Sequence, residues 1–238
     1  MGNYNRFAEE YARQTEEIEQ ETRKHFYSLI PNSLESKLLL DVGCGSGHDA
    51  EYYTRRGAKV SGIDLSKREI EMANRRGCGI FVVGSMDDLP YNSNSFDIVT
   101  SVYALQASND VPKALGEMVR VAKPGAAILI VTKHPFRNLI EGHVNDQNSD
   151  YYAKREVTSR IFNQTITLSE PGHTMMEYFH PSILSKATLE LFEEHTDFPA
   201  SEQVILGMKY PTFMILKFLK KSLFNNPAKA KGYLFDLP

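Results

Sequence analysis

The stretch from Leu38 to Asp49, which reads Leu-Leu-Leu-Asp-Val-Gly-Cys-Gly-Ser-Gly-His-Asp, constrains the fold more than any other part of the chain. Its aliphatic start predicts a buried strand of a parallel sheet, because such strands are apolar on both faces. Gly43, Gly45 and Gly47 follow at alternate positions. Glycines there let the backbone turn sharply and let a ligand approach without an intervening Cβ atom. Residues 48–56 then read as a helix, which gives the order strand, glycine-rich turn, helix.

The sequence repeats this alternation of strand and helix up to residue 133. Strands that alternate with helices favour parallel pairing, so we expect a doubly wound, seven-stranded, mostly parallel α/β sheet of the Rossmann-like type. The strands are expected over 37–42, 59–63, 80–83, 96–101 and 126–132, with two more near 203–206 and 213–218. Further helices are expected over 66–77, 111–122 and 182–192.

Two segments depart from this alternation. Residues 1–30 carry aromatic residues at helical spacing and many glutamates, which predicts an amphipathic helix that either packs on the domain or forms a lid. Residues 136–156 are polar and rich in turn residues. Two β-rich runs follow, over 157–168 and 173–180, so we interpret about 136–180 as a β-hairpin cap inserted after the fifth strand. Residues 1–238 are expected to form a single domain.

Composition excludes several classes of protein. The chain has 238 residues, 42% of them hydrophobic, and a formal net charge of -3, which gives no reason to expect a nucleic-acid partner. No apolar run approaches the roughly 18 residues of a membrane span, and residues 1–21 lack the apolar core of a signal peptide. Cys44 and Cys78 have no metal-ligand spacing. We therefore expect a cytoplasmic protein that binds neither membranes nor nucleic acids.

The spacing of the glycines limits the ligand. A dinucleotide fingerprint, Gly-x-Gly-x-x-Gly, needs its third glycine at position 48 or 50, where this chain has His48 and Ala50. The Gly-Lys-Ser/Thr of a phosphate-binding P-loop is absent from the sequence. An acid does follow the second expected strand, at Asp64, where folds of this kind place a carboxylate against ribose hydroxyls.

Asp41-x-Gly43-x-Gly45-x-Gly47 resembles motif I of the class I S-adenosylmethionine (SAM)-dependent methyltransferases, and further motifs of that family follow in order. They are Asp64 in Gly-Ile-Asp-Leu-Ser, the segment 84–97 as the adenine loop and fourth strand, and 117–125, Glu-Met-Val-Arg-Val-Ala-Lys-Pro-Gly. The motifs cover 38–135 densely and the rest thinly. The chain is most similar to small-molecule members of the methyltransferase type 11 kind.

The resemblance implies SAM as cofactor, S-adenosylhomocysteine as product and no metal. Asp64 is expected to accept hydrogen bonds from the ribose hydroxyls, Asp41 to steer the ammonium group directly or through water, and a carbonyl near Ser101 to assist it. The full set of expected cofactor-binding residues is Asp41, Gly43, Cys44, Gly45, Gly47, Asp64, Leu65, Met86, Asp87 and Ser101.

One position departs from the family pattern. Many members have an aspartate where this chain has Ser85, and that aspartate commonly binds the adenine amino group. Two replacements are open here, the side chain of Asp87 and the backbone of Met86.

Methyl transfer from a sulfonium is an in-line displacement, so the enzyme mainly has to align nucleophile, methyl group and sulfur. A base helps when the acceptor is a hydroxyl or a cationic amine. We expect His134, just after the fifth strand, or His180 as that base, since histidine titrates near neutral pH. Expected acceptor-binding residues are Tyr11, Tyr103, Gln106, His173 and Tyr178.

The predicted function is methyl transfer to an oxygen or nitrogen of a small molecule, with a peptide end as a further acceptor class. Two alternatives stay open: a SAM-binding, catalytically silent interaction scaffold, and a nicotinamide oxidoreductase, which His48 disfavours.

Overall fold

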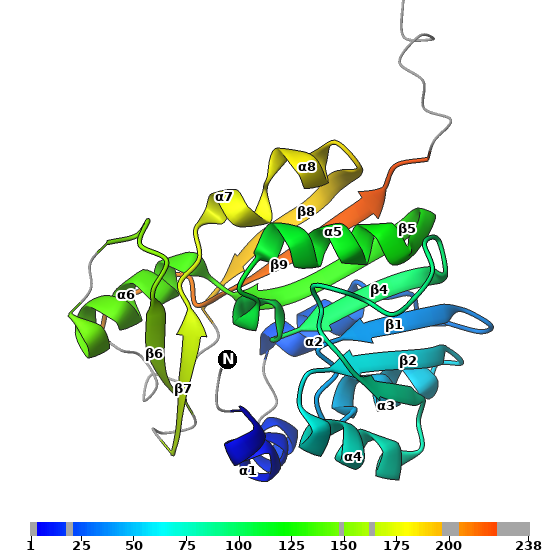
Figure 1. The fold of residues 1–238 in the computed structure, drawn as a ribbon, viewed down its shortest axis with the longest axis horizontal. Coiled ribbons are helices and arrows are strands. Elements are labelled where there is room, and N and C mark those ends of the chain that lie inside the picture. Colours follow the sequence, from blue (N-terminus) through cyan, green and yellow to red (C-terminus); the bar gives the residue numbers. More distant parts are fainter. Residues whose placement is uncertain (1–3, 18–20, 148–149, 162–164, 197–204, 223–238) are drawn as a thin grey trace, which may run out of the picture.

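The computed structural model describes residues 4–17, 21–147, 150–161, 165–196 and 205–222. A central sheet runs through the molecule (Figure 1). The strands are β1 (Leu38–Val42), β2 (Lys59–Asp64), β3 (Ile80–Val83), β4 (Phe96–Val102), β5 (Ala122–Lys133), β6 (Glu156–Ile161), β7 (Ile166–Pro171), β8 (Ala187–His195) and β9 (Phe213–Lys220). The helices are α1 (Tyr4–Glu17), α2 (Glu21–Ser28), α3 (His48–Thr54), α4 (Lys67–Arg76), η1 (Leu105–Ala107), α5 (Val111–Val121), α6 (Pro135–Asp146), α7 (Met175–Tyr178) and α8 (Pro181–Leu184).

The central sheet has seven strands in the order β3-β2-β1-β4-β5-β9-β8. Strands β1 to β5 pair in parallel, while β9 is antiparallel to both β5 and β8. The order reverses between β1 and β4, and open sheets of this kind bind ligands at the carboxyl ends of the strands beside that reversal. The predicted doubly wound, seven-stranded, mostly parallel sheet is confirmed.

Helices cover both faces of the sheet. On one face α5, α7 and α8 pack with Leu115, Tyr178 and Ile183 against β4, β5 and β9. On the other face α2, α3 and α4 contribute Phe26, Tyr53 and other apolar residues. Strand β1 is buried between the two layers, which explains its continuous aliphatic sequence.

The insertion after β5 differs from the predicted one. Residues 135–146 form helix α6, where turns were expected, because Pro135 occupies its first turn and the His134 Nδ1 atom accepts from Phe136 N at 3.0 Å. The hairpin does form, but its arms are β6 and β7, and they pair from Glu156–Pro171 to Ile161–Ile166. The expected second arm, 173–180, is instead a turn and the short helix α7, which a capping box of Thr174 and Glu177 begins.

A buried group of charged residues holds the insertion on the sheet; we call it the insertion cluster. The Lys133 ammonium, at the end of β5, lies 2.6 Å from Glu141 Oε2 and 3.1 Å from Glu170 Oε2. Arg137 Nε donates to Glu141 Oε1 at 2.8 Å, and Ser159 Oγ donates to Glu141 Oε2 at 2.8 Å. These residues come from β5, α6, β6 and β7, so the cluster joins the insertion to the sheet.

The expected helix over 182–192 is wrong. Only Pro181–Leu184 is helical, and Ala187–His195 forms the edge strand β8. Its side chains alternate between exposed and half-buried, which is the period of a strand, and its pairing with β9 outweighs the helical preference of Leu and Glu. The strand expected near 203–206 falls partly outside the described residues, and residues 205–206 are not in a strand. The strand near 213–218 is β9.

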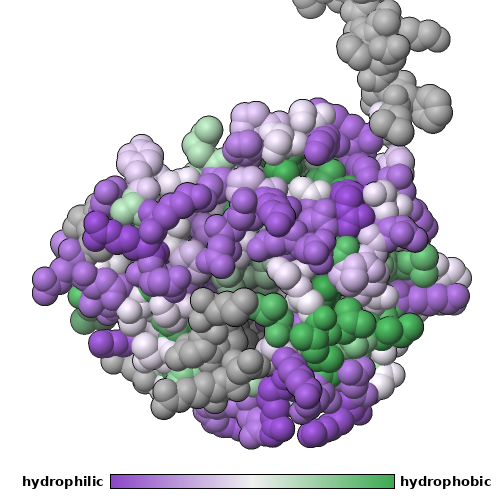
Figure 2. All heavy atoms as spheres, in the orientation of Figure 1, coloured by the Kyte–Doolittle hydropathy of each residue, from purple (hydrophilic) through white to green (hydrophobic). Residues whose placement is uncertain are grey.

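The described residues up to Ser28 are helical, as expected, and form α1 and α2; residues 18–20 lie outside the described residues. α1 contacts α4 and β7, and α2 contacts β5. Within the described residues, no helix is long and apolar enough to cross a membrane. Figure 2 shows a mostly hydrophilic face with a hydrophobic area beside the region of β2 and β3. On β3, Ile80 and Val83 are 72% and 52% exposed.

Candidate functional site

The glycine-rich turn follows β1 at the carboxyl edge of the sheet. Gly43, Gly45 and Gly47 have φ angles of +74°, +49° and +81°, a left-handed region that favours glycine. A Cβ atom on Gly43 would lie 2.1 Å from the Cβ atom of Ala104. Gly43 N and Cys44 N donate to the Ile63 carbonyl, at 2.8 and 3.1 Å, and tie the turn to β2. The three glycines therefore allow a backbone conformation at this turn that residues with a side chain would not readily adopt.

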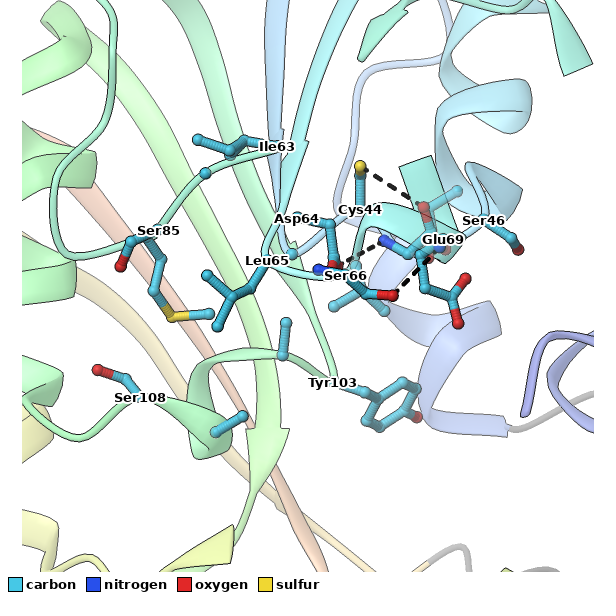
Figure 3. A pocket seen from close by; sticks show the side chains of 18 of the residues that line it. Cys44, Ser46, Ile63, Asp64, Leu65, Ser66, Glu69, Ser85, Tyr103 and Ser108 are labelled. Carbon is cyan, nitrogen blue, oxygen red and sulfur yellow. Dashed lines mark hydrogen bonds between the residues drawn. The ribbon is translucent and has the colours of Figure 1, made fainter. Parts of the chain in front are cut away.

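Asp64, the last residue of β2, is held by the same turn. Gly45 N donates to its Oδ2 atom at 3.0 Å and Ser66 N to its Oδ1 atom at 2.8 Å (Figure 3). Burial raises the pKa of Asp64, and the N–H groups of Ser66 and Gly45 partly oppose that shift. The carboxylate is thus placed at the carboxyl end of β2 in one fixed orientation.

A cavity of about 500 Å³ opens in front of these residues. Its volume is within the usual range of small-molecule sites. Its walls come from the glycine turn, the end of β2, the loops after β3 and β4, and helices α1, α2, α3 and α4. The lining residues are Ala12, Arg23, Gly43, Cys44, Gly45, Ser46, His48, Asp49, Ile63, Asp64, Leu65, Ser66, Glu69, Gly84, Ser85, Met86, Asp87, Val102, Tyr103, Ala104, Ala107, Ser108 and Asn109.

Arg23 and Asp49 form a buried ion pair in the cavity wall. Arg23 Nη1 lies 2.8 Å from Asp49 Oδ1 and 3.0 Å from Oδ2, and Tyr27 OH donates to Oδ1 at 2.5 Å. Burial lowers the pKa of Arg23, but Asp49 and Tyr27 more than offset this and leave it raised, so the guanidinium stays charged. Arg23 belongs to α2, and the pair therefore joins the N-terminal helices to α3.

Asp41 lies behind the turn, not in the cavity wall. It is 1% exposed, and Thr100 Oγ1 donates to its Oδ1 atom at 3.0 Å. Its Oδ2 atom has no hydrogen-bond partner among the described residues. Burial and the nearby Asp49 carboxylate raise the pKa of Asp41 to about 8. A buried oxygen without a partner is costly, which fits a group that a ligand or a water would satisfy.

Glu69, on α4, faces the same part of the cavity as Asp64 (Figure 3). Burial first, and the Asp64 carboxylate second, raise its pKa to about 8. Two carboxyl groups with raised pKa values on one wall make this the acidic side of the cavity.

The loop after β3 supplies the opposite wall. Asp87 N donates to Ser85 Oγ at 3.1 Å, and Ser108 Oγ donates to Asp87 Oδ1 at 3.0 Å. Asp87 keeps one carboxylate oxygen beyond this bond, and Met86 lines the cavity beside it. Both candidates for adenine binding are therefore at the cavity.

The structure brings together most of the expected cofactor residues. Gly43, Cys44, Gly45, Asp64, Leu65, Met86 and Asp87 line the cavity, as does Tyr103 from the expected acceptor-binding set. Asp41, Gly47, Ser101, Gln106, His134, His173, Tyr178 and His180 do not. Tyr11 lies on α1, next to the lining residue Ala12, and its side chain is outside the described residues.

The two expected bases lie away from the cavity. His134 is a buried N-cap whose Nε2 atom is 2.9 Å from Glu194 Oε1, and burial lowers its pKa against the effect of Glu194. His180 caps α8, and its Nδ1 atom is 2.8 Å from Ser182 Oγ. Each histidine is accounted for by a helix cap.

The expected acceptor-binding residues of the insertion are buried below the cavity. His173 Nε2 lies 3.0 Å from the Gln106 carbonyl oxygen, and the Tyr178 hydroxyl lies 3.5 Å from Thr132 Oγ1. Gln106 in turn donates to the Tyr103 carbonyl at 2.6 Å. This chain of contacts supports the loop after β4, which carries Tyr103.

Sequence reasoning missed Arg23, His48, Asp49 and Glu69. Arg23 and Asp49 are far apart in the sequence, so only the packing of α2 on α3 reveals the pair. Glu69 donates from its backbone N to Ser66 Oγ at 3.2 Å, which caps the start of α4. Its side chain instead faces the cavity, and no pattern in the sequence indicates this.

The fold and the cavity together define an α/β protein with a ligand site at the switch point of its sheet. A family model described as a methyltransferase domain matches residues 40–130. A SAM-dependent methyltransferase of known structure from Mesorhizobium loti superposes with a TM-score of 0.62 at 18% identity, covering 83% of this chain and 96% of that chain.

Two of the curated proteins that align with the chain are described here by their names. One is a phthiotriol/phenolphthiotriol dimycocerosates methyltransferase of Mycobacterium leprae, 29% identical over 66% of this chain and 61% of the relative. The other is a demethylmenaquinone methyltransferase of Renibacterium salmoninarum, 37% identical over 42% of this chain and 45% of the relative. The chain thus spans about half the length of the curated relatives it matches. Residues 40–130 thus match a methyltransferase-domain family, and the fold is similar to that of SAM-dependent methyltransferases of known structure.

Proposed function

We propose that this protein transfers the methyl group of SAM to an oxygen or nitrogen atom of a small molecule. The main support is the position of Asp64 beside the glycine turn. Its carboxylate is held by Gly45 N and Ser66 N and faces a cavity of about 500 Å³. SAM carries two ribose hydroxyls and no phosphate, and a carboxylate accepts from hydroxyls through charge-assisted hydrogen bonds.

The polar groups of the cavity fit the rest of the cofactor. SAM ends in an ammonium and a carboxylate, and the wall beside the glycine turn offers one buried cation, Arg23, and one buried anion, Asp49. Gly43 lets the loop after β4 pack closely against the turn, since a Cβ atom there would collide with Ala104. Asp87 and Met86 lie on the wall proposed for adenine. The Asp41 Oδ2 atom has no hydrogen-bond partner among the described residues and lies behind the turn. A water could bridge this atom and the ammonium group of SAM.

When bound, the cofactor supplies an electrophilic methyl group on a sulfonium. The chain's own contribution is alignment, because an in-line displacement needs nucleophile, carbon and sulfur in a row. Tyr103 has a φ of +54°, a strained position for a tyrosine, and packs against Phe213 with ring centroids 4.7 Å apart. We propose that Tyr103 is held there to orient the acceptor.

A base is proposed only for acceptors that must lose a proton. His134 and His180 were the sequence candidates, and both lie outside the cavity wall. His48 does line the cavity, and burial lowers its pKa, so it is neutral near pH 7 and able to accept a proton. His48 is therefore the proposed base for acceptors that must lose a proton, whereas a neutral amine or an already ionised oxygen needs no base.

The class of acceptor is proposed from the cavity and the relatives. Two relatives have names that specify small molecules as the compounds methylated. The formal net charge of -3 disfavours nucleic acid.

Calorimetric titration with SAM, S-adenosylhomocysteine and NAD tests the cofactor. We expect the first two to bind, NAD not to bind, and Asp64→Asn to weaken SAM roughly 10- to 150-fold, since a hydrogen bond to a charged group contributes about 1.5–3 kcal/mol. Ser93→Ala, on an exposed loop outside the cavity, is the matched control and should bind SAM as the wild type does. NAD binding or an unchanged affinity of the Asp64→Asn variant would refute the assignment.

The second candidate is a SAM-binding scaffold without transfer activity, which the two histidines outside the cavity wall favour. Incubation with methyl-labelled SAM and a panel of amines, phenols and carboxylates separates the two functions. Labelled product with any acceptor establishes the enzyme. Tight SAM binding with no S-adenosylhomocysteine formed across the panel supports the scaffold.

A further inference from the structure

Three side chains with metal-binding atoms meet between α2 and β8, outside the residues that line the cavity. His25 lies on α2, and Glu193 and His195 lie two residues apart on β8. The ligand atoms of the three residues all lie within 4.8 Å of one another. His25 Nε2 is 2.6 Å from Glu193 Oε2, and His195 Nε2 is 3.3 Å from the same oxygen. One carboxylate oxygen is thus shared by two imidazoles from elements that are far apart in the sequence.

This arrangement has the chemistry and nearly the dimensions of a zinc site. Zinc binds imidazole nitrogen and carboxylate oxygen at about 2.0–2.1 Å in a tetrahedron, which places neighbouring ligand atoms about 3.3 Å apart. The His195–Glu193 separation already has that value. The 2.6 Å between His25 and Glu193 would have to widen by a few tenths of an ångström, a small side-chain rotation at a half-exposed histidine.

We propose that His25, Glu193 and His195 bind a divalent transition-metal ion, best Zn²⁺, and that this ion fastens α2 to the edge strand of the sheet. Two imidazoles and one carboxylate select zinc over magnesium and calcium, which prefer oxygen ligands. The side chains are 41%, 33% and 24% exposed in the order of the chain, so an ion can enter and a water can complete its coordination. This proposal departs from the expectation of no metal.

The strand side of the site is rigid. β8 pairs with β9 along its whole length, and the His195 carbonyl accepts both from Thr212 N at 2.8 Å and from Thr212 Oγ1 at 3.1 Å. Glu193 and His195 face the same side as Leu191, which belongs to the apolar cluster of Phe26 on α2. Two of the three ligands are therefore preorganised, which lowers the cost of binding an ion.

The helix side connects the site to the cavity. His25 is two residues from Arg23, whose guanidinium lines the cavity, and two from Tyr27, which donates to Asp49. None of the three proposed ligands lines the cavity itself. The ion is accordingly a structural clamp on α2 and takes no part in methyl transfer.

Metal binding is measured on tag-free, chelator-treated full-length protein, by calorimetric titration with ZnCl₂ and by metal analysis after desalting. We expect one zinc per chain, and MgCl₂ should not compete. His25→Ala, His195→Ala and Glu193→Gln should each weaken zinc at least about tenfold. His143→Ala, which removes an exposed histidine of α6, is the matched control and should leave zinc affinity unchanged. Zinc affinity that is absent, or equal in the wild type and the His195→Ala variant, would show that the three residues form only an ion pair.

Amide hydrogen exchange tests the clamp. At a free zinc concentration 100 times the dissociation constant, amides of α2 that exchange through opening of this contact should slow up to about 100-fold, and those of α5 should not. Zinc should have no effect on α2 exchange in the His195→Ala variant. Binding without slower exchange of α2 would overturn the clamp. Neither readout depends on methyl transfer, so failure here leaves the proposed function intact.

Discussion

Carboxyl groups are buried in two regions of the molecule, around the cavity and in the insertion cluster, and their surroundings differ. At the cavity, Asp41 has an oxygen without a partner among the described residues, and the pKa values of Asp41 and Glu69 are raised to about 8. In the insertion cluster, burial alone would raise the pKa of Glu141, but Arg137 and Lys133 hold it down at about 2. Around the cavity Asp41 and Glu69 are therefore protonated near neutral pH, whereas in the insertion cluster Glu141 is ionised and paired with two cations. Carboxyl groups with strongly raised pKa values beside a cavity mark a candidate ligand site.

The largest change in the free energy of unfolding should come from Glu141→Ala. This change leaves Lys133 and Arg137 buried with fewer anionic partners, and breaking a buried ion pair typically costs about 3–5 kcal/mol. We expect a loss of that size in the free energy of unfolding, measured by urea denaturation. SAM affinity of the folded protein should stay within about twofold, because the cluster is outside the cavity wall. If the variant is as stable as the wild type, the insertion cluster does not stabilise the fold.

Gly43→Ala should have the next largest effect, and here the damage falls on the site. The new methyl group would collide with Ala104, and the positive φ adds about 1–2 kcal/mol of strain. We expect both lower stability and a loss of SAM binding at least as large as that of Asp64→Asn, measured by calorimetry.

Gly77→Ala is the matched control for the collision. Gly77 has a φ of +67°, but apart from its chain neighbours no atom of the described residues lies within 4 Å of the position of an added methyl group, so only the backbone strain of about 1–2 kcal/mol applies. Its SAM affinity should equal that of the wild type. If Gly43→Ala and Gly77→Ala bind SAM equally well, the close contact between Gly43 and Ala104 does not matter for binding.

The contributions of the two regions to stability should change in opposite directions with pH. For Glu69 the folded pKa is raised, so its contribution is complete below pH 4.5 and is lost as the pH rises from about 4.5 to about 8. For Glu141 the folded pKa is depressed, so its contribution is present above pH 4.5 and is lost as the pH falls from 4.5 towards about 2.

We would measure the contribution of Glu69 by comparing the free energy of unfolding of the wild type and the Glu69→Gln variant from pH 4 to 9. Relative to the variant, the wild type should lose up to a few kcal/mol between pH 4.5 and 8. A pH-independent difference between the two proteins would show that Glu69 titrates normally.

The smallest effect is expected at the surface. Glu51 pairs with Arg55 at 2.5 Å and with Arg76 at 3.2 Å, and all three side chains are partly exposed. Exposed pairs contribute about 0–1 kcal/mol, so Glu51→Ala should change the free energy of unfolding by no more than that. A loss comparable to that of Glu141→Ala would mean that burial does not distinguish the two sets of ion pairs.

The same contrast explains how far the sequence could predict the structure. The cavity half, β1 to β5, is built from strand–helix units whose signals are local, such as the Ser66 cap, the αL glycine at Gly77 and the aliphatic run before Asp41. The sheet, the glycine turn and the place of Asp64 were accordingly predicted.

The half after β5 depends on contacts between distant residues. Ala187–His195 is a strand only because it pairs with β9, and α6 is held by the insertion cluster, which joins Lys133 to Glu170. Expected roles for His134 and His180 rested on sequence position alone, whereas their cap geometry is visible only in three dimensions. Arg23 likewise reaches the cavity through packing of α2 that no local pattern encodes. The assignments of the individual site residues stay predictions for the experiments above.

The sheet order has a consequence for the making of the protein. Strand β8 attaches to the sheet only through β9, which follows it in the chain and lies between β8 and β5. During synthesis from the N-terminus, β1 to β5 can pair as they emerge from the ribosome, but β8 has no edge to join until Phe213–Lys220 has appeared. Until then the free edge of β5 is open to other strands, so a ribosome stalled before residue 213 would carry a nascent chain prone to aggregation.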